Sequence, residues 1–183
     1  MLYDWEEGLC ALLCFCVAMI VIEPSIRAKF PRSAFTKRGL ESFLADAASA
    51  ARLKGSVAVL LTGDEEIRRL NREFRGKDKA TDVLSFPAGD GITRTRMAGD
   101  LAVSVETAAR EAERRGHALD LELRVLLLHG VLHLAGYDHE TDSGEMARRE
   151  SLLRKKLGLE KQGLAQGLIA RAATEGTRRG RRP

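Results

Sequence analysis

Three of the four histidines in the chain fall within the eleven residues H-G-V-L-H-L-A-G-Y-D-H, as His129, His133 and His139. Residues four apart on a helix lie on one face, so His129 and His133 would point the same way. Gly136 can end that helix, because glycine accepts the left-handed conformation that a side chain resists. The following turn can then bring His139 to the same point. Three imidazoles leave one tetrahedral position open, which is the arrangement of a catalytic zinc.

The helix that carries the first two histidines is expected to be buried. Its sequence before Gly136, L-R-V-L-L-L-H-G-V-L-H-L, is apolar on nearly every side. Two buried rings without partners would cost roughly 1 to 3 kcal/mol each. A pair at this spacing also occurs by chance among ordinary core histidines, but a shared metal removes the cost and uses all three rings.

The residue after His129 separates two kinds of zinc chemistry. Zinc lowers the pKa of a bound water to about 7, and the spacing here coincides with the zinc-peptidase motif H-E-x-x-H-x-x-G-x-x-H. Gly130 stands where that motif has its general base, which disfavours a peptidase. A phosphodiester substrate needs a cation beside the metal instead. Arg75, with Lys77 and Lys79, offers one, although such a run is also typical of a solvated loop.

Strands and helices alternate along the part of the chain that must position these residues. Apolar runs bounded by turn signals predict strands over 19–22, 56–61, 82–86 and 100–105. Helical spacing predicts helices from Thr36 to about Leu53, over 106–115, and up to Gly136. We expect an α+β single domain, with a small mixed β-sheet flanked by helices and the metal site on a central buried helix and the loop after it.

Several helix starts carry capping signals. Thr36 and Asp120 are predicted caps, and the pairs Thr62 with Glu65 and Asp142 with Glu145 have the spacing of capping boxes. The helix opened by Thr62 is expected to turn three side chains inward, those of Ile67, Leu70 and Phe74.

Charge and cysteine content indicate the cellular compartment in which the protein works. The net charge is +4, but the tail from residue 160 holds six basic and two acidic residues, which leaves 24 of each sign elsewhere. Cys10, Cys14 and Cys16 are clustered and odd in number, which favours a reducing compartment. The apolar run 9–22 is shorter than a membrane span, and acidic residues precede it where a secretion signal has basic ones. We expect a cytoplasmic protein without stable membrane association.

The chain divides into three parts on this evidence. Residues 1–18 form an N-terminal extension of unassigned role, with Met19 as an alternative start. Residues 19–158 form the catalytic domain. Residues 159–183 form a basic tail that is expected to be disordered, and its arginines either bind RNA phosphates or are simply solvated.

The histidine block closely resembles the signature of the YbeY family, bacterial zinc-dependent endoribonucleases involved in ribosomal RNA maturation. The block L-N-R-E-F-R-G-K-D-K-A-T-D-V-L-S-F-P at 70–87 looks like that family's other hallmark, and G-D-L-A-V-S at 99–104 resembles its following strand. The resemblance covers about residues 56 to 156. Ala80 replaces the usual proline, which is expected to loosen the loop.

The resemblance implies roles for four residues. His129, His133 and His139 would bind one zinc ion, and Arg75 would match the functional arginine beside the metal. It also implies single-strand-specific endoribonuclease activity in small-subunit rRNA 3′-end maturation and ribosome quality control. The partners implied are rRNA, the small ribosomal subunit and its proteins. A ribosome-assembly binding protein with a structural zinc is the alternative, and a zinc peptidase is a weaker one.

Four residues near these motifs keep open roles. Asp82 and Asp100 are each either an acceptor that fixes a ligand tautomer or a strand-end cap. Asp138 is expected to orient His139 or to move protons, and Tyr137 to serve packing. The sequence indicates no oligomeric state.

Overall fold

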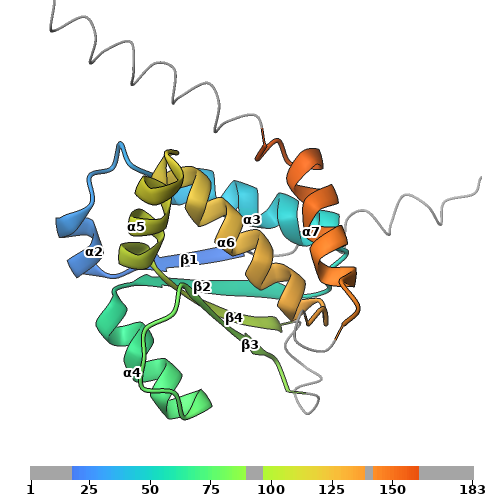
Figure 1. Ribbon diagram of the computed structural model, residues 1–183, viewed down its shortest axis with the longest axis horizontal. Helices are drawn as coiled ribbons and strands as arrows, with labels where there is room; N and C mark the ends of the chain where they lie inside the picture. Colours follow the sequence, from blue (N-terminus) through green and yellow to red (C-terminus); the bar gives the residue numbers. More distant parts are fainter. Residues whose placement is uncertain (1–17, 90–96, 139–141, 161–183) are drawn as a thin grey trace, which may run out of the picture.

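The computed structural model describes residues 18–89, 97–138 and 142–160. A four-stranded sheet in the order β1-β2-β4-β3 lies at its centre (Figure 1). β1 (Ala18–Ile22), β2 (Ser56–Thr62) and β4 (Met97–Ser104) are parallel, whereas β3 (Val83–Pro87) is antiparallel to β4. The predicted α+β single domain with a small mixed sheet is therefore confirmed.

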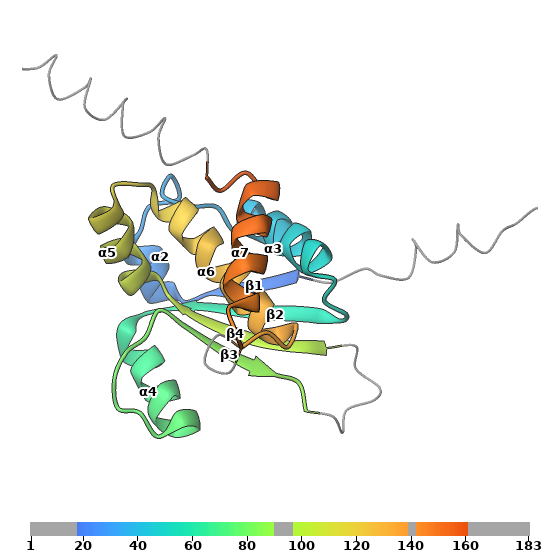
Figure 2. The same ribbon diagram turned by 45° about the vertical axis from the view of Figure 1, so that its right-hand side comes forward.

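Helices cover the two faces of the sheet unequally. α3 (Lys37–Ala51), α5 (Val105–Arg115), α6 (Leu119–Leu134) and α7 (Glu145–Lys156) lie over one face, and α4 (Asp64–Arg75) lies over the other (Figures 1 and 2). The short helix α2 (Pro24–Lys29) follows β1 and was not predicted. α6 runs across the middle of the first face, so the predicted central helix is the one that carries His129 and His133.

The main core lies between the sheet and the larger helical layer. Alternate strand residues point into it, because successive side chains of a strand face opposite sides. They meet the apolar face of α6, and the fully buried members include Ile20, Val57, Val59, Leu61, Leu101, Val103, Leu123, Leu127 and Val131. The prediction that the histidine-bearing helix is buried is thus confirmed.

A smaller core lies beneath α4 on the second face, formed by Ile67, Leu84 and Ala102. Phe74 was expected to join it, and this was wrong. Its side chain is 61% exposed and meets the ring of Phe86 edge to face, with centroids 5.2 Å apart. Phe74 lies in the last turn of the helix, where it contacts the edge strand β3 through Phe86 and stays largely exposed to solvent.

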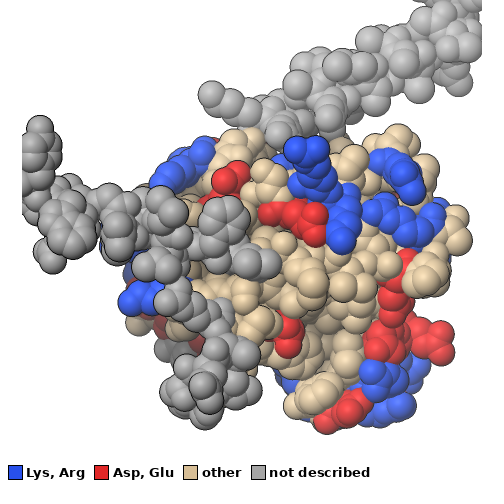
Figure 3. All heavy atoms as spheres, turned by 180° about the vertical axis from the view of Figure 1, so that it is seen from behind, with Lys and Arg blue, Asp and Glu red and all other residues tan. Residues whose placement is uncertain are grey.

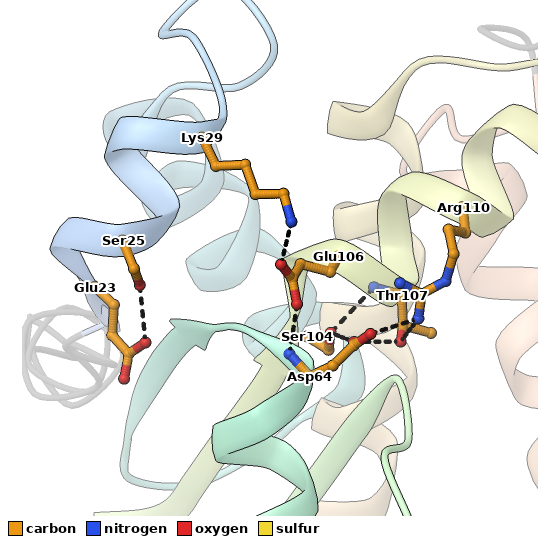
Figure 4. Close-up of polar contacts among 8 residues, drawn as sticks. All are labelled: Glu23, Ser25, Lys29, Asp64, Ser104, Glu106, Thr107 and Arg110. Carbon is orange, nitrogen blue, oxygen red and sulfur yellow. Dashed lines mark hydrogen bonds and ion pairs between the residues drawn. The ribbon is translucent and has the colours of Figure 1, made fainter.

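The network at the start of α4 differs from the predicted capping box. Thr62 is the buried last residue of β2, and Gly63 is the cap position without a side-chain bond. The Asp64 amide instead donates to Glu106 Oε2 over 2.8 Å, and Glu106 also pairs with Lys29 (Figure 4). The carboxylate of Asp64 accepts hydrogen bonds from three further side chains, those of Ser104, Thr107 and Arg110. α4 is therefore tied to the junction of β4 and α5.

The other predicted caps have mixed outcomes. Thr36 Oγ1 accepts from the Gly39 amide over 3.1 Å, as expected. Ala118, rather than Asp120, occupies the cap position of α6, and Asp120 pairs with Arg124 one turn on. Asp142 accepts from the Met146 amide over 2.7 Å, so it does help to open α7.

The outer edge of β1 is not bare. The amide of Ile20, at the centre of the strand, donates to Glu41 Oε1 of α3 over 3.2 Å. Glu41 in turn lies 3.5 Å from Lys37 Nζ. A side chain from the helical layer thus supplies a partner that a neighbouring strand would otherwise provide.

The remaining surface carries charges of both signs. Seen from behind, Lys and Arg lie beside Asp and Glu around a largely uncharged middle (Figure 3). No helix of the described ranges is both long and apolar enough to cross a membrane. The predicted N-terminal extension, apart from Ala18, lies outside the described residues, as do the three cysteines and the tail beyond residue 160.

Candidate active site

Two of the predicted metal ligands lie side by side near the end of α6. The Nε2 atoms of His129 and His133 are 3.1 Å apart, and their rings meet at 76° with centroids separated by 4.8 Å. Tetrahedral zinc with Zn–N bonds of about 2.0–2.1 Å places two ligand nitrogens about 3.3 Å apart. The expected common direction of the two rings is observed, and their spacing fits a shared metal ion.

The third predicted ligand, His139, lies outside the described residues. α6 ends at Leu134, and Gly136 has a φ of 88°, the left-handed conformation expected of it. The Asp142 amide donates to the Asp138 carbonyl over 2.9 Å, so these two residues lie close together. Within the described ranges no three His, Cys, Asp or Glu side chains gather as a metal site. The three-histidine centre stays a prediction.

Gly130 lets α6 approach the sheet closely. A Cβ atom built there would lie 2.8 and 2.9 Å from the two terminal carbons of Leu101 on β4. Leu101 is itself buried, so it has little room to withdraw. A side chain at position 130 would point into the core and away from the cleft that the histidines face. The glycine that distinguishes this chain from the peptidase motif therefore has a packing cause.

Glu150 of α7 contacts the first histidine. Its Oε2 lies 3.2 Å from His129 Nδ1, and its Oε1 accepts from Arg154 over 2.5 Å. Burial raises the pKa of the Glu150 carboxyl. The hydrogen bond to His129 and the charge of Arg154 together lower the pKa by a larger amount, so it lies below its usual value. The Glu150 carboxylate thus lies on the Nδ1 side of the His129 ring, opposite the Nε2 atom that faces His133.

A cleft of about 750 Å³ opens in front of the two histidines. One wall comes from α6 and Asp138, and the other comes from α4 and the loop before β3. The described lining residues are Asn71, Arg75, Lys77, Lys79, Thr81, Asp82, Val83, Ser85, His129, His133 and Asp138. The predicted cation Arg75 and the predicted ligands therefore share one cavity, although they are more than fifty residues apart in sequence.

The loop that carries the lysines is anchored from within. Asn71 is 2% exposed, and its amide donates to the Lys79 carbonyl over 2.8 Å. Gly76 ends α4 in the left-handed conformation, with a φ of 66°. At the outer side of the loop, Asp78 accepts two hydrogen bonds of 2.8 Å from Arg68. These contacts hold the backbone between Arg75 and β3 at the mouth of the cleft, despite the replacement of proline by Ala80.

Arg75 differs from the other arginines of its helix. Arg68 and Arg72 pair with Asp78, and Arg69 pairs with Glu66 and Glu73. Across the described part of the chain no carboxylate forms an ion pair with Arg75. Its guanidinium faces a cleft rather than a resident acid, which leaves it available to an anionic ligand.

The open aspartate roles are now distinguished. Asp82 Oδ1 accepts from the Val83 amide over 2.8 Å and from Thr81 Oγ1 over 3.1 Å, so it caps the start of β3. Asp100 is exposed on β4 opposite Phe86 and does not line the cleft. Among the described residues the acceptor beside a predicted ligand is Glu150 instead. Tyr137 packs against the main core, as expected.

A sequence signal for Glu150 did exist. Met146, Glu150 and Leu153 fall at helical spacing, and both Met146 and Leu153 are buried. An acidic residue on the apolar face of a helix demands a partner, because a buried charge is costly when unpaired. The partner lies on another helix, so the sequence alone does not identify it.

The fourth histidine has a structural partner. His117 Nε2 lies 2.9 Å from Glu122, a carboxylate that is 1% exposed. Arg115 reaches the same carboxylate at 3.1 Å. This cluster joins the end of α5 to the start of α6, away from the cleft.

Comparison with known proteins gives consistent matches. A family model described as Endoribonuclease YbeY matches residues 27–158. A protein of that name from Koribacter versatilis is 56% identical over 125 residues, which are 68% of this chain and 79% of the relative. One from Nautilia profundicola is 53% identical over 105 residues, 56% of this chain and 73% of the relative.

More distant matches include a plant protein and a solved structure. The Arabidopsis thaliana protein named Endoribonuclease YBEY, chloroplastic, is 48% identical over 115 residues, 60% of this chain and 20% of its own length. The solution structure of TM1509 from Thermotoga maritima has a TM-score of 0.52 and 26% identity, and the match covers 90% of this chain and 99% of that one.

Proposed function

Because the chain belongs to the YbeY family of endoribonucleases, we propose that it is a zinc-dependent enzyme that cuts single-stranded RNA. Its task is 3′-end maturation of small-subunit rRNA and ribosome quality control in the cytoplasm. The similar proteins from Koribacter versatilis and Nautilia profundicola are both named endoribonucleases, which supports this role. The zinc, the rRNA substrate and the ribosomal partners are inferred from the family resemblance and the site.

One observation carries the proposal. A cleft of about 750 Å³ holds two histidine nitrogens 3.1 Å apart on one wall, and it is also lined by Arg75, for which the described residues provide no acidic partner. Nitrogen ligands suit zinc, and a planar guanidinium suits the paired oxygens of a phosphodiester. The shared cavity of His129, His133 and Arg75 supports the proposal of a phosphodiester-cutting site.

Each residue has a defined part in the proposed reaction. His129, His133 and His139 would hold the metal ion through their ring nitrogens, which add no negative charge to it. Zinc, when bound, acts as a Lewis acid and lowers the pKa of water at its open position. Arg75 binds the phosphate and stabilises the charge that grows on its oxygens during attack. Lys77 and Lys79 add positive potential at the mouth, and Asp138 lies in the cleft where a proton must be accepted.

The cleft favours single strands. Its size is that of a small-molecule site, of the order of 300–1,000 Å³, so it accepts a short run of nucleotides. The bases and backbone of an A-form duplex are held in a rigid helix, whereas unpaired segments can bend a phosphate into a cavity. The residues before 160 carry equal numbers of basic and acidic side chains. The basic tail that follows them is therefore the main source of nonspecific attraction to RNA phosphates in this proposal.

Metal analysis combined with an RNA cleavage assay tests the proposal. Wild-type protein is expected to bind one zinc per chain and to cut single-stranded RNA, and His133→Ala to lose both metal and cleavage. Arg75→Ala should keep zinc and its melting temperature while cleavage falls by at least about 100-fold, since loss of one charge-stabilising donor costs about that much. Arg69→Ala removes an arginine of the same helix outside the cleft and should cut RNA normally.

Two outcomes would favour the rivals. A ribosome-assembly protein with a structural zinc would support rRNA maturation unchanged after Arg75→Ala and would unfold when metal is removed. A peptidase would cleave unstructured peptides. The packing at Gly130 opposes the peptidase, because a glutamate there would be directed at Leu101 rather than at a substrate.

A further inference from the structure

The contact between His129 and Glu150 joins two helices at the metal-facing ring. The carboxylate of Glu150 reaches Nδ1 at 3.2 Å, on the side of the imidazole opposite Nε2. Its side chain is 14% exposed and its second oxygen is occupied by Arg154. The acid therefore makes a two-sided contact: one oxygen serves the histidine and the other serves the cation.

This contact determines which nitrogen of His129 carries hydrogen. The carboxylate accepts from Arg154 through its other oxygen, so it acts as an acceptor and the Nδ1 atom of the ring donates to it. In the neutral ring the lone pair then lies on Nε2, the atom that faces His133 Nε2 at 3.1 Å. Only a nitrogen with a free lone pair can bind a metal ion. The contact of Glu150 with Nδ1 thus leaves the lone pair of Nε2 directed toward the place of the proposed metal ion.

We propose that Glu150, held by Arg154, is a positioning residue that fixes the tautomer and ring orientation of His129 for metal binding. The inference rests on the proposed function only in naming zinc as the metal. The contact itself is present in the described residues without any metal. Outer acceptors of this kind raise the affinity of a histidine site by about 10- to 100-fold.

The placement of α7 gives the contact its rigidity. Met146 and Leu153, on either side of Glu150, are each 1% exposed in the main core. Arg149, the preceding residue, donates to the Ala50 carbonyl of α3 over 2.9 Å. The carboxylate therefore approaches His129 from a helix that is packed in the core. If the imidazole rotated, Glu150 could not move with it, and the hydrogen bond between them would break.

A plain structural role makes a different prediction. If Glu150 only joined α7 to α6, its loss would lower stability and leave the histidine tautomer and the intrinsic zinc affinity unchanged. Tautomer and affinity are thus the measurements that separate the two roles, and thermal stability is not.

The test compares full-length Glu150→Ala, Glu150→Gln and Glu113→Ala. Long-range nitrogen–proton NMR on the metal-free proteins reports which nitrogen of His129 carries hydrogen. Competition with a chromophoric chelator reports the dissociation constant for zinc alone. The Gln variant keeps an acceptor oxygen of similar reach, and Glu113→Ala removes an exposed carboxylate of α5 remote from the site.

We expect His129 to be protonated at Nδ1 in wild type, Glu150→Gln and Glu113→Ala, and to become a mixture of tautomers in Glu150→Ala. The zinc dissociation constant should rise by about 10- to 100-fold in Glu150→Ala and by less in Glu150→Gln. An unchanged tautomer and an unchanged dissociation constant in folded Glu150→Ala would overturn the inference. If that variant does not fold, Glu150→Gln with protonation moved to Nε2 overturns it as well.

Failure of the proposed function is distinguishable. Wild type that binds no zinc, or that binds zinc and cuts no RNA, contradicts the proposed function. The tautomer in metal-free protein still decides the role of Glu150 in that case.

Discussion

Gly130 is the residue whose identity the fold restricts most directly at the site. His129 and His133 point outward from α6, and Gly130 between them faces β4 at a distance that leaves no room for a methyl group. The helix cannot move away without withdrawing the fully buried Val131 and Leu132 from the core. One face of α6 therefore presents the two histidines to the cleft, while the opposite face packs on β4 through Gly130.

The first prediction concerns this packing. Gly130→Ala should lower the free energy of unfolding by about 1–3 kcal/mol, because an added methyl overpacks the contact with Leu101. Urea denaturation followed by circular dichroism measures the change. Gly89→Ala, where a Cβ meets nothing within 4 Å, serves as the control and should change stability by no more than about 1 kcal/mol. Equal stability of the Gly130 variant and wild type would show that Leu101 moves aside.

Sequence patterns identified the histidines, whose spacing is local, and missed Glu150, whose partner lies on another helix. The two histidines on one helical face could be predicted because i, i+4 spacing is a property of the helix itself. Arg75 could be placed beside them through the family resemblance alone. Glu150 could not be assigned, because its contact spans α6 and α7 and depends on how those helices pack.

α4 shows how one element is fixed from both ends. Its first residue, Asp64, lies in the network with Ser104, Thr107 and Arg110, and Glu106 accepts from its amide (Figure 4). Its last residue, Arg75, lines the cleft. Contacts of Asp64 and Glu106 thus hold the start of the helix whose last residue lines the cleft.

The second prediction is a pH dependence at Asp64. Burial raises the pKa of this carboxyl, but hydrogen bonds from Ser104, Thr107 and Arg110 lower it by more, so its pKa lies below the usual 3.8. A lowered folded-state pKa stabilises the protein above the unfolded value, and this contribution is lost as the pH falls through the folded-state pKa. Wild type should therefore exceed Asp64→Asn in stability at neutral pH and lose that advantage below pH 3.8.

Urea denaturation at several pH values measures the difference. Asp46→Asn, a change at an exposed position of α3, is the control and should show no such pH-dependent gap. A constant gap between wild type and Asp64→Asn down to the most acidic pH would contradict the assignment.

The strands and most helices were predictable because their apolar periodicity is local. The start of α4 was not, since Thr62 belongs to β2 and the acceptor for the Asp64 amide comes from α5. The burial of Phe74 was wrongly predicted because periodicity cannot tell that the strand beneath this residue lies at the edge of the sheet. The strand order β1-β2-β4-β3 likewise depends on crossovers that no short motif specifies.

Apolar packing holds α6, the helix that carries His129 and His133, within the molecule. Leu123, Leu127 and Val131 of α6 are all 0% exposed against the sheet and neighbouring helices. The histidines lie at the border of this core. Apolar packing therefore gives this domain a source of stability that does not depend on the proposed zinc ion.

The third prediction follows for metal removal. Chelation should leave the far-UV circular dichroism spectrum and cooperative unfolding in place, while abolishing RNA cleavage. Zinc should raise stability only by mass action, about 2.7 kcal/mol at one hundred times its dissociation constant. Loss of helical signal on chelation, restored by zinc, would instead identify the metal as structural.

The bond from the Ile20 amide to Glu41 has a consequence for self-association. An edge strand with free amides is a template on which another copy can add a strand, and proteins block such edges with charged side chains. Here the Glu41 carboxylate already accepts from the amide at the centre of β1. If two copies paired through this edge, the charge of that carboxylate would be buried between them without a partner. The helical layer that packs on the core thereby also disfavours edge-to-edge pairing of two copies through β1.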